Sequence, residues 1–475
     1  MASSLKSWLD DPQFVFDFAA NDIVVDLFAG GGGASVGIEA ALGRPVDVAI
    51  NHNPVALAIH EVNHPTTLHL SSDVWEVDPR LVARGRNVKL AWFSPDCTHF
   101  SRAKGATPVE KNIRSLAWVV VDWIDKVAPE VIAVENVPEL LDWGPLVQAR
   151  DSKGEPRWKP DGGAFMIPDR ARKGETFREW VEAIRAHGYS LDYRTLKGSD
   201  YGAPTSRERL FVVARRDGAA IKWPQPTHGT QGNPPMTATD IIDWGIITPS
   251  VFLAKEEGKA LGVTIRRPLA NSTLLRIAKG VRQFVINTDA PYFISAACST
   301  GATHPGLACA HIIKHFTGIT GQDIRKPLAT ITAIDHHGLV VSRVAELEAP
   351  TEEERYMAWW AARFIEEYSP APDTDTIASL IPEERASYLR VDGQYMLVDI
   401  GMRMLEPKEL FKGQGFPNDY VFDRDQHGKR FTKTAQIAAC GNSVPPVLTQ
   451  VVVQSQLCES AQNKEVQMGI AAAGK

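Results

Sequence analysis

Two residues of this chain lie where folded proteins often place reactive groups, directly after short apolar runs. Cys97 follows the run VKLAWFSP (88–95), within the polar segment SPDCTHFS. Its thiolate would be a nucleophile there, although a lone cysteine is more often an inert apolar side chain. Glu135 ends the run VIAVE; when buried it could donate a proton near neutral pH, or it could simply pair with a buried base. The residues alone leave both interpretations open.

A glycine-rich loop supplies a second kind of chemistry, the binding of a nucleotide-like ligand. The apolar run DIVVDLFAG (22–30) leads into four consecutive glycines, Gly30 to Gly33, and then into ASVGIEAALG, whose spacing predicts a helix that ends at Gly43. Strand, glycine loop and helix form the first unit of many nucleotide-binding sheets. Phosphate binding, adenosyl binding and a plain tight turn all fit this pattern.

The elements that must position these residues alternate between strand and helix. The run VDVAI (46–50) precedes the helical pattern NPVALAIHEVNHP, and LAWVVVDWIDKV (116–127) precedes VIAVENV (131–137). This alternation predicts an α/β fold with a doubly wound, mostly parallel sheet. Because parallel strands end at one edge, Cys97, Glu135 and the glycine loop should meet in one crevice.

Composition bounds the protein class. The chain has 475 residues, 44% of them hydrophobic, and a formal net charge of -6, which favours a globular protein of two domains and excludes one that is basic overall. Five cysteines without a close pair and an acidic rather than apolar N-terminus favour a cytoplasmic protein. No apolar run approaches a membrane span.

Charge is uneven in the second half of the chain. Residues 251–330 contain ten bases and four acids, which could form a phosphate-facing surface or an ordinary solvated one. Residues 346–393 contain twelve acids and four bases, and within them the segment 352–368 predicts a solvated helix that packs through its Trp and Phe side chains.

Six motifs occur in one order along the chain and together resemble the cytosine-C5 DNA methyltransferase family. They are DLFAGGGG (26–33), SPDCTHFS (94–101), ENV (135–137), YGAPTSRERLFVVARR (201–216), RMLEPKELFKGQGFPNDY (403–420) and CGNSVPP (440–446). The resemblance implies a Rossmann-like methyltransferase sheet with a smaller inserted target-recognition domain. We expect the first part of the catalytic domain in 1–216, the recognition domain in 217–400, and a return to the catalytic domain in 401–475.

The resemblance also implies the reaction, methyl transfer from S-adenosylmethionine to C5 of a cytosine flipped out of duplex DNA. Cys97 matches the family's nucleophile, which adds to C6 of the ring. Glu135 matches the acid that protonates or hydrogen-bonds ring N3. Arg209 matches the arginine that holds the pyrimidine carbonyl, and Arg207 its partner near the nucleophile.

Further residues match the family's ligand-binding positions. For the cofactor these are the loop residues Phe28, Gly30, Gly32 and Gly33, the strand-end residues Asn51 and Asp73, the adenine-packing Leu116, and the late residues Asn442, Ser443 and Val444. Arg325 matches an arginine near the DNA.

Three positions depart from the family pattern. Asp96 replaces the second proline before the nucleophile, and we expect its carboxylate to point away from Cys97, whose thiol it would otherwise make less acidic. Asn51, followed by His52, replaces an acid that contacts the ribose, which predicts weaker cofactor binding because charge assistance is lost. Thr205 replaces a glutamine at the start of the arginine motif.

Other functions and partners remain as alternatives. A transfer-RNA cytosine methyltransferase shares the fold, but its branch carries a Cys-Phe-Thr motif that this chain lacks; a DNA-binding regulator without turnover would retain the fold despite Asp96 and Asn51. We expect double-stranded DNA as the partner, a monomer, no metal and no membrane, while a companion restriction endonuclease stays open. The segment 144–173, rich in glycine, proline and charge, predicts a mobile loop.

Overall fold

The computed structural model describes residues 22–96, 116–229, 232–260, 262–263, 265–295, 306–315, 320–334, 336–370 and 389–458. Cys97, the predicted nucleophile, lies outside these residues. Among the described residues, no helix combines the length and the apolar character needed to cross a membrane.

The larger sheet confirms the predicted doubly wound architecture. Its seven strands lie in the order β3-β2-β1-β4-β5-β9-β8. The first five run parallel to one another, and β9 lies antiparallel to both of its neighbours. The bounds are β1 Asp22–Leu27, β2 Val48–Asn51, β3 Leu68–Ser71, β4 Asn87–Phe93, β5 Val131–Asn136, β8 Ser190–Lys197 and β9 Glu208–Arg215.

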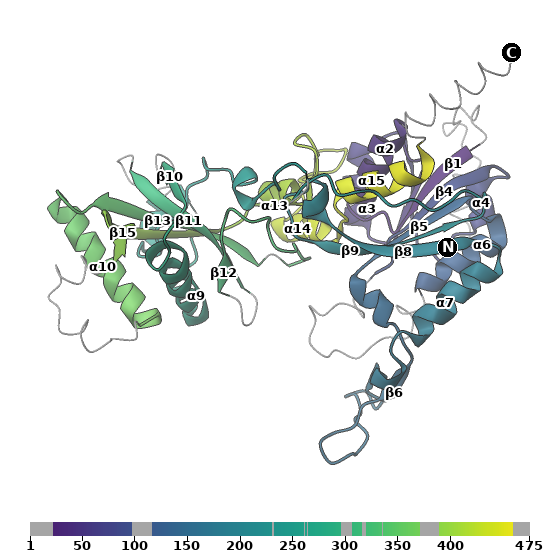
Figure 1. Cartoon of the computed structure of the whole chain (residues 1–475), viewed down its shortest axis with the longest axis horizontal. Helices are drawn as coiled ribbons and strands as arrows, with labels where there is room; N and C mark the ends of the chain where they lie inside the picture. The colour runs from purple at the N-terminus through teal and green to yellow at the C-terminus, as the bar shows by residue number, and fades with distance from the viewer. Residues whose placement is uncertain are drawn as a thin grey trace.

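Helices cover both faces of this sheet, as its nearly continuous apolar strands require. Along β1, Ile23, Val25 and Leu27 face one core, and Val24 faces the other. The first core is covered by α4 (Pro79–Ala83), α6 (Val119–Val127) and α7 (Glu175–Ala186). The second is covered by α2 (Gly33–Leu42) and α15 (Pro446–Leu457), with α3 (Pro54–Asn63) nearby (Figure 1).

Helix α15 returns the C-terminal end of the chain to the first helix. A methyl group on Gly37 of α2 would lie 2.3 Å from the carbonyl oxygen of Pro446 and 2.6 Å from Cβ of Thr449. Only glycine therefore permits this distance between the two helices. The contact places the residues just before α15 beside the loop that precedes α2.

The smaller sheet is antiparallel and forms a separate domain. Its strands follow the order β10-β11-β13-β15-β14, and β12 pairs with β11. Helices α9 and α10 share a core with the sheet. The strands and helices are β10 Phe293–Ser295, β11 Leu307–Lys314, β12 Gly321–Gln322, β13 His337–Glu346, β14 Arg390–Val391, β15 Tyr395–Met404, α8 Lys255–Ala260, α9 Asn271–Val281 and α10 Glu352–Tyr368.

The acidic segment forms helix α10, as predicted, but the packing face differs in part from the prediction. Ala358, Ala361, Phe364 and Ile365 are buried. Trp360 is 41% exposed, because it lies on the side of the helix opposite the buried Ala358, and it contacts the guanidinium of Arg363 instead. The prediction that the Trp side chains pack inward was therefore wrong for Trp360.

The two sheets lie at opposite ends of an elongated molecule, and a third group of elements joins them (Figure 1). The joining elements are α13 (Pro407–Gln414), α14 (Lys433–Asn442) and parts of the segments 238–244 and 324–331, which share one apolar core. The remaining pair of strands, β6 (Leu146–Gln148) and β7 (Met166–Pro168), forms an arm that projects from the parallel-sheet end.

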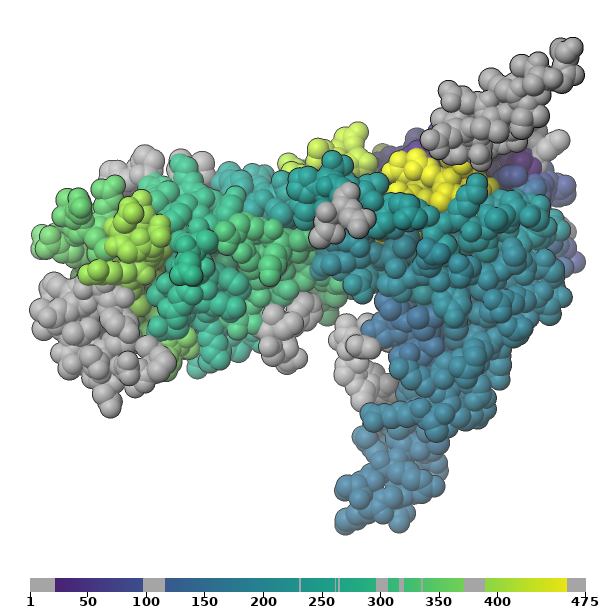
Figure 2. Space-filling model, viewed as in Figure 1, coloured from purple at the N-terminus to yellow at the C-terminus, as the bar shows by residue number. Residues whose placement is uncertain are grey.

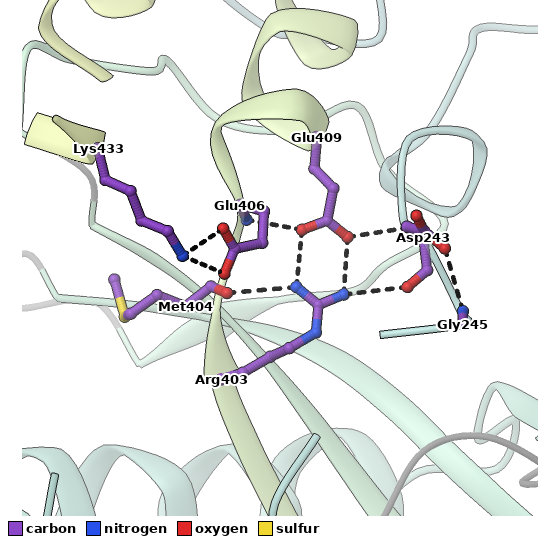
Figure 3. A network of polar contacts seen from close by, with 7 residues as sticks. All are labelled: Asp243, Gly245, Arg403, Met404, Glu406, Glu409 and Lys433. Atoms are coloured by element: carbon purple, nitrogen blue, oxygen red, sulfur yellow. Dashed lines mark hydrogen bonds and ion pairs between the residues drawn. The ribbon is translucent and has the colours of Figure 1, made fainter. Parts of the chain in front are cut away.

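A buried ion pair fixes the junction between the antiparallel sheet and the joining elements (Figure 3). Arg403, near the end of β15, donates from both terminal nitrogens to the Glu409 carboxylate at 2.7 Å each, and the two side chains are only 7% and 1% exposed. The Glu409 oxygens also accept the backbone N–H groups of Asp243 and Glu406. One carboxylate thus holds three segments together.

Replacing Glu409 by Gln should lower the free energy of unfolding by about 3–5 kcal/mol, because the buried guanidinium loses its counter-charge. Urea denaturation monitored by tryptophan fluorescence would measure the loss. The matched control is Glu406→Gln, which neutralises a carboxylate three residues away whose ion pair with Lys433 is much more exposed. We expect this control to cost about 1 kcal/mol or less; equal losses in the two variants would contradict the role of the buried pair.

Candidate catalytic and cofactor site

The glycine loop turns sharply between β1 and α2. Phe28 has a backbone φ of 63° and Gly32 a φ of 89°, both in the left-handed region, which is costly for a phenylalanine. The backbone N–H of Ala29 donates to the Ile50 carbonyl on the neighbouring strand β2 at 3.1 Å. The strained turn is therefore held against the sheet, with the half-buried Phe28 side chain packed against the first core.

The late residues close over this loop from the other end of the chain. A Cβ atom on Gly33 would lie 2.3 Å from the Val444 carbonyl oxygen and 3.2 Å from Cβ of Ser443. The Tyr420 hydroxyl donates to the Gly31 carbonyl at 2.7 Å. Ser443 and Val444 thus lie beside the loop as the resemblance implied, whereas Asn442, the last residue of α14, has an exposed side chain.

The other predicted cofactor residues follow the same edge of the sheet. Asn51 ends β2, and its side-chain oxygen accepts the Asn53 N–H at 2.8 Å. Asp73 lies two residues after β3, is exposed, and accepts the Trp75 N–H at 3.0 Å. The half-buried Leu116 packs, like Phe28, against the first core. This edge therefore combines a glycine turn, polar side chains at two strand ends and two apolar side chains, which suits a ligand with both an adenosyl and a charged portion.

The predicted catalytic acid lies at the carboxyl end of β5. Its oxygen Oε1 lies 2.8 Å from Nε of Arg209 on β9, and the two side chains are 9% and 10% exposed. The carboxylate of Glu135 is therefore paired with a buried base, which was one of the two interpretations. It also lies at the carboxyl edge of the sheet, as a proton donor to a substrate would. The Arg209 atom Nη1 donates to the Glu208 carbonyl at 2.7 Å.

Asn136, which the sequence analysis did not single out, links this pair to the segment before Cys97. Its side-chain amide donates to the Pro95 carbonyl at 3.0 Å. The bond fixes the end of the β4 segment two residues before Cys97, against the end of β5. The motif ENV contained this residue, so the sequence offered a signal for it.

Arg207 has a different environment from Arg209. It is buried, and its terminal nitrogens donate to the Ile331 carbonyl at 2.5 Å and to the Gly441 carbonyl at 2.9 Å. Its backbone N–H donates to the Thr205 hydroxyl at 3.2 Å, so the threonine that replaces the family's glutamine stabilises the turn into β9. Arg207 thus joins three segments that are distant in sequence.

Arg325 lies in the turn after β12 and is exposed. Its guanidinium pairs with Asp323 at 2.7 Å and donates to the Ala290 carbonyl at 2.9 Å. Three residues later, the Leu328 carbonyl accepts the Ser206 N–H at 2.7 Å, which brings this turn close to the arginine motif. Asp96 is also exposed. That its carboxylate points away from Cys97 stays a prediction, because Cys97 lies outside the described residues.

A buried polar chain lies beneath the glycine loop and was not foreseen from the sequence. The Ser35 hydroxyl donates to Oδ2 of Asp26 at 2.8 Å and accepts from Nε2 of His60 at 2.9 Å, while Nδ1 of His60 lies 2.8 Å from Nε2 of His69. Burial lowers the pKa of both histidines, that of His69 to about 4. They are therefore neutral and give Asp26 no counter-charge.

Burial raises the pKa of Asp26 from 3.8 to about 7, and the charges of Glu39 and Glu135 add to the rise. Between these two values the folded protein keeps a proton that the unfolded chain has lost, so stability falls as pH rises. We expect Asp26→Asn, which cannot ionise, to gain about 1.4 kcal/mol relative to the native protein for each pH unit across this range. Chemical denaturation at pH 5, 6 and 7 tests this, and a difference that stays constant with pH would contradict it.

The family model for C-5 cytosine-specific DNA methylase matches residues 23–144 and 169–250. The Type II methyltransferase M.AquIA of Picosynechococcus sp. is 26% identical over 211 residues, which are 43% of this chain and 77% of that protein. M.AgeI of Thalassovita gelatinovora is 29% identical over 210 residues, 43% of this chain and 42% of that protein.

The chain therefore spans less than half of M.AgeI and about three quarters of M.AquIA. Among solved structures, a mutant of Spodoptera frugiperda DNMT2 is similar with 15% identity and a TM-score of 0.46, over 92% of this chain and 99% of that one. This structural likeness is too low to carry an argument about function.

Proposed function

Because residues 23–144 and 169–250 match the family model for C-5 cytosine-specific DNA methylase, we propose that the chain transfers a methyl group from S-adenosylmethionine to C5 of a cytosine in duplex DNA. The observation that carries the proposal is the buried Glu135–Arg209 pair, whose strand end is bonded through Asn136 to Pro95. These contacts gather an acid, a base and the segment leading to Cys97 at one edge of the sheet.

The residues at the adjoining edge fit the cofactor. The glycine turn leaves no room for a side chain at Gly33, Asn51 supplies a polar group at the end of β2, and Phe28 and Leu116 offer apolar surface. We propose that these residues, with Asp73, Ser443 and Val444, hold S-adenosylmethionine. The bound cofactor supplies an electrophilic methyl group on a sulfonium.

In the proposed reaction, the chain's own residues activate the cytosine. The Cys97 thiolate forms a bond to C6 while Glu135 holds a proton at N3, so the electron pair of the C5–C6 double bond makes C5 nucleophilic. From a ring methylated at C5, loss of the C5 proton to a base would give its electron pair to the C5–C6 double bond, and the bond between C6 and Cys97 would break to return the thiolate. The target base must leave the helix stack for Cys97 to reach C6.

Arg209 is proposed to position Glu135 and to bind the target base. Its Nε atom holds one Glu135 oxygen, and Nη2, unlike Nη1, makes no hydrogen bond within the described part of the chain. This free donor suits the pyrimidine carbonyl. Arg207 is proposed to act through the backbone it holds at Ile331 and Gly441 rather than by touching the base.

The antiparallel-sheet domain is proposed to read the DNA sequence. A hollow lies between this domain and the rest of the molecule (Figure 2). The segment 251–330 brings ten basic residues to this domain, Arg325 among them, which would hold DNA phosphates while other side chains of the domain read base edges in the grooves.

Tritiated methyl transfer from S-adenosylmethionine to unmethylated genomic DNA tests the proposal directly. We expect label in 5-methylcytosine, absent from Cys97→Ser and reduced about 100-fold or more in Glu135→Gln, because general acid catalysis is worth about that factor. Bulk transfer RNA serves as the competing substrate. Label in RNA alone would replace the proposal by an RNA methyltransferase, and DNA binding without label would replace it by a regulator.

The departure at Asn51 generates a separate prediction about cofactor affinity. Asn51→Glu should bind S-adenosylmethionine about five- to tenfold more tightly, because a carboxylate accepts a ribose hydroxyl with charge assistance. Isothermal titration calorimetry measures the dissociation constants. Asn51→Gln is the matched control, since it lengthens the side chain without adding charge. If Gln and Glu bind equally, the missing charge is not the cause.

A further inference from the structure

We propose that the projecting arm, residues 145–168, is a second DNA-contacting element, which grips the duplex backbone on the side of the target opposite the antiparallel-sheet domain. The inference rests on the proposed function, because it takes duplex DNA as the occupant of the hollow. The family model matches the chain on both sides of the arm and leaves these residues unmatched. The match to the family model therefore assigns no role to the arm.

The arm is an ordered ribbon, although the sequence predicted a loop. At its foot, β6 and β7 pair from Leu146 with Pro168 to Gln148 with Met166. Further out, the segment around Arg157 is bonded to both sides of the ribbon. The Arg157 N–H donates to the Ala149 carbonyl at 2.8 Å, and the Phe165 N–H donates to the Arg157 carbonyl at 3.0 Å. A β-ribbon of this kind can enter the major groove or lie along the backbone of DNA.

The foot of the arm is anchored near the catalytic pair. The chain runs from Glu135 through the short turn Pro138–Asp142 to the buried Trp143, and the ribbon begins only a few residues later. The Asp169 N–H donates to the Pro145 carbonyl at 2.9 Å, which closes the foot. The arm therefore leaves the same edge of the sheet that carries Glu135.

The arm and the antiparallel-sheet domain form the two sides of the hollow (Figure 2). In the view of Figure 1, the arm extends from the parallel-sheet end, below α7, while the antiparallel sheet extends from the other end of the molecule. A duplex that reaches the edge with Glu135 from this side would pass between the two projections.

The exposed surface of the arm suits a polyanion. It carries the exposed bases Arg150, Lys153 and Arg157, the half-buried Lys159, and Trp158, which is 62% exposed. Two of its three acids are used in turns: Asp151 accepts the N–H groups of Lys153 and Glu155, and Asp161 accepts that of Gly163.

The cationic side chains of the arm are not neutralised by ion pairs. Within the described residues, the ion pairs of this region are Arg172–Glu175 and Lys173–Asp142, which lie beyond the foot. Arg157 lies over the Phe165 ring at 4.5 Å, and Arg150 donates to the Gly154 carbonyl at 2.7 Å. Among the residues that the structure describes, Lys153 and Lys159 have no carboxylate partner, so phosphates can approach them without displacing one. Phosphate contacts of this kind position a protein on DNA without reading its sequence.

The test measures binding of a fluorescent duplex of random sequence, about 40 base pairs long, between about 50 and 200 mM KCl. The test variant is Lys153→Ala/Lys159→Ala. The control is Arg80→Ala/Arg84→Ala, which removes the same charge from α4 and the residue that follows it, at the right-hand end of the molecule in Figure 1, away from the antiparallel sheet. In the test variant, we expect the slope of the logarithm of the binding constant against the logarithm of salt concentration to become shallower by about two. Binding near 0.1 M KCl should be weaker by about tenfold or more. The control should match the native protein.

An excision variant tests the arm as a whole. Because Leu146 and Pro168 are paired across the ribbon, residues 147–167 can be replaced by Asn-Gly, which closes a two-residue hairpin. Retained S-adenosylmethionine binding and thermal unfolding show that the catalytic domain is intact. The variant should lose at least as much affinity as the double substitution. Native affinity and slope in both arm variants, or an equal loss in the α4 control, would overturn the inference.

The binding assay separates this inference from the proposed function. A native chain that binds DNA without methylating it, but loses affinity when the arm is changed, would refute the enzyme and support the arm. A chain that methylates DNA and binds it equally well without the arm would support the enzyme and refute the arm.

Discussion

The packing of α15 against α2 is the contact on which the candidate site depends. The two helices come from opposite ends of the chain, and at Gly37 the backbone of α15 lies too close for any side chain. Because α15 follows directly after Val444, this contact sets where Ser443 and Val444 lie above the glycine loop. Tyr420 adds a bond from another late segment to Gly31. The site is thus built from the first and last described elements at once.

The buried carboxylates of this protein differ in the groups that compensate their negative charge. Glu135 and Glu409 each pair with a guanidinium: Glu135 joins β5 to Arg209 on β9, and Glu409, paired with the nearby Arg403, also accepts the distant Asp243 N–H. Asp26 has a serine hydroxyl and two neutral histidines instead, so its charge is not compensated and its pKa rises to about 7. Paired charges therefore fix the framework in this fold. The unpaired acid lies beneath the glycine loop and is bonded to Ser35 of α2.

The shape of the molecule follows from how these segments are joined. The antiparallel sheet is held to the joining elements by Arg403 and Glu409, and the chain just before the arm is held to α7 by the bond from the Phe177 N–H to the Trp143 carbonyl. Both projections are therefore anchored through hydrogen bonds to the body that carries Glu135 (Figure 2). A long polyanion between them would meet the proposed catalytic groups midway along its contact with the protein.

The sequence by itself determined the local elements and the ordered motifs that resemble one family. Apolar runs that end in glycine or polar residues predicted the parallel strands, and β1, α2 and the end of that helix at Gly43 agree with the prediction. Ordered motifs also indicated Glu135 and Arg209, because the family resemblance preserves residue identity and order. Periodicity failed at Trp360, since an amphipathic pattern does not distinguish a buried tryptophan from one that packs along its own helix.

Only the tertiary structure decided which distant groups meet. No local pattern states that Arg207 donates to Ile331 and Gly441, that Asn136 holds Pro95, or that Ser35 connects Asp26 to His60, because these contacts depend on how strands and helices are brought together. The ribbon at 145–168 was hidden for a related reason. Its glycines, prolines and charges are typical of loops, and its order comes from hydrogen bonds between three short segments that are each too short to be recognised as strands.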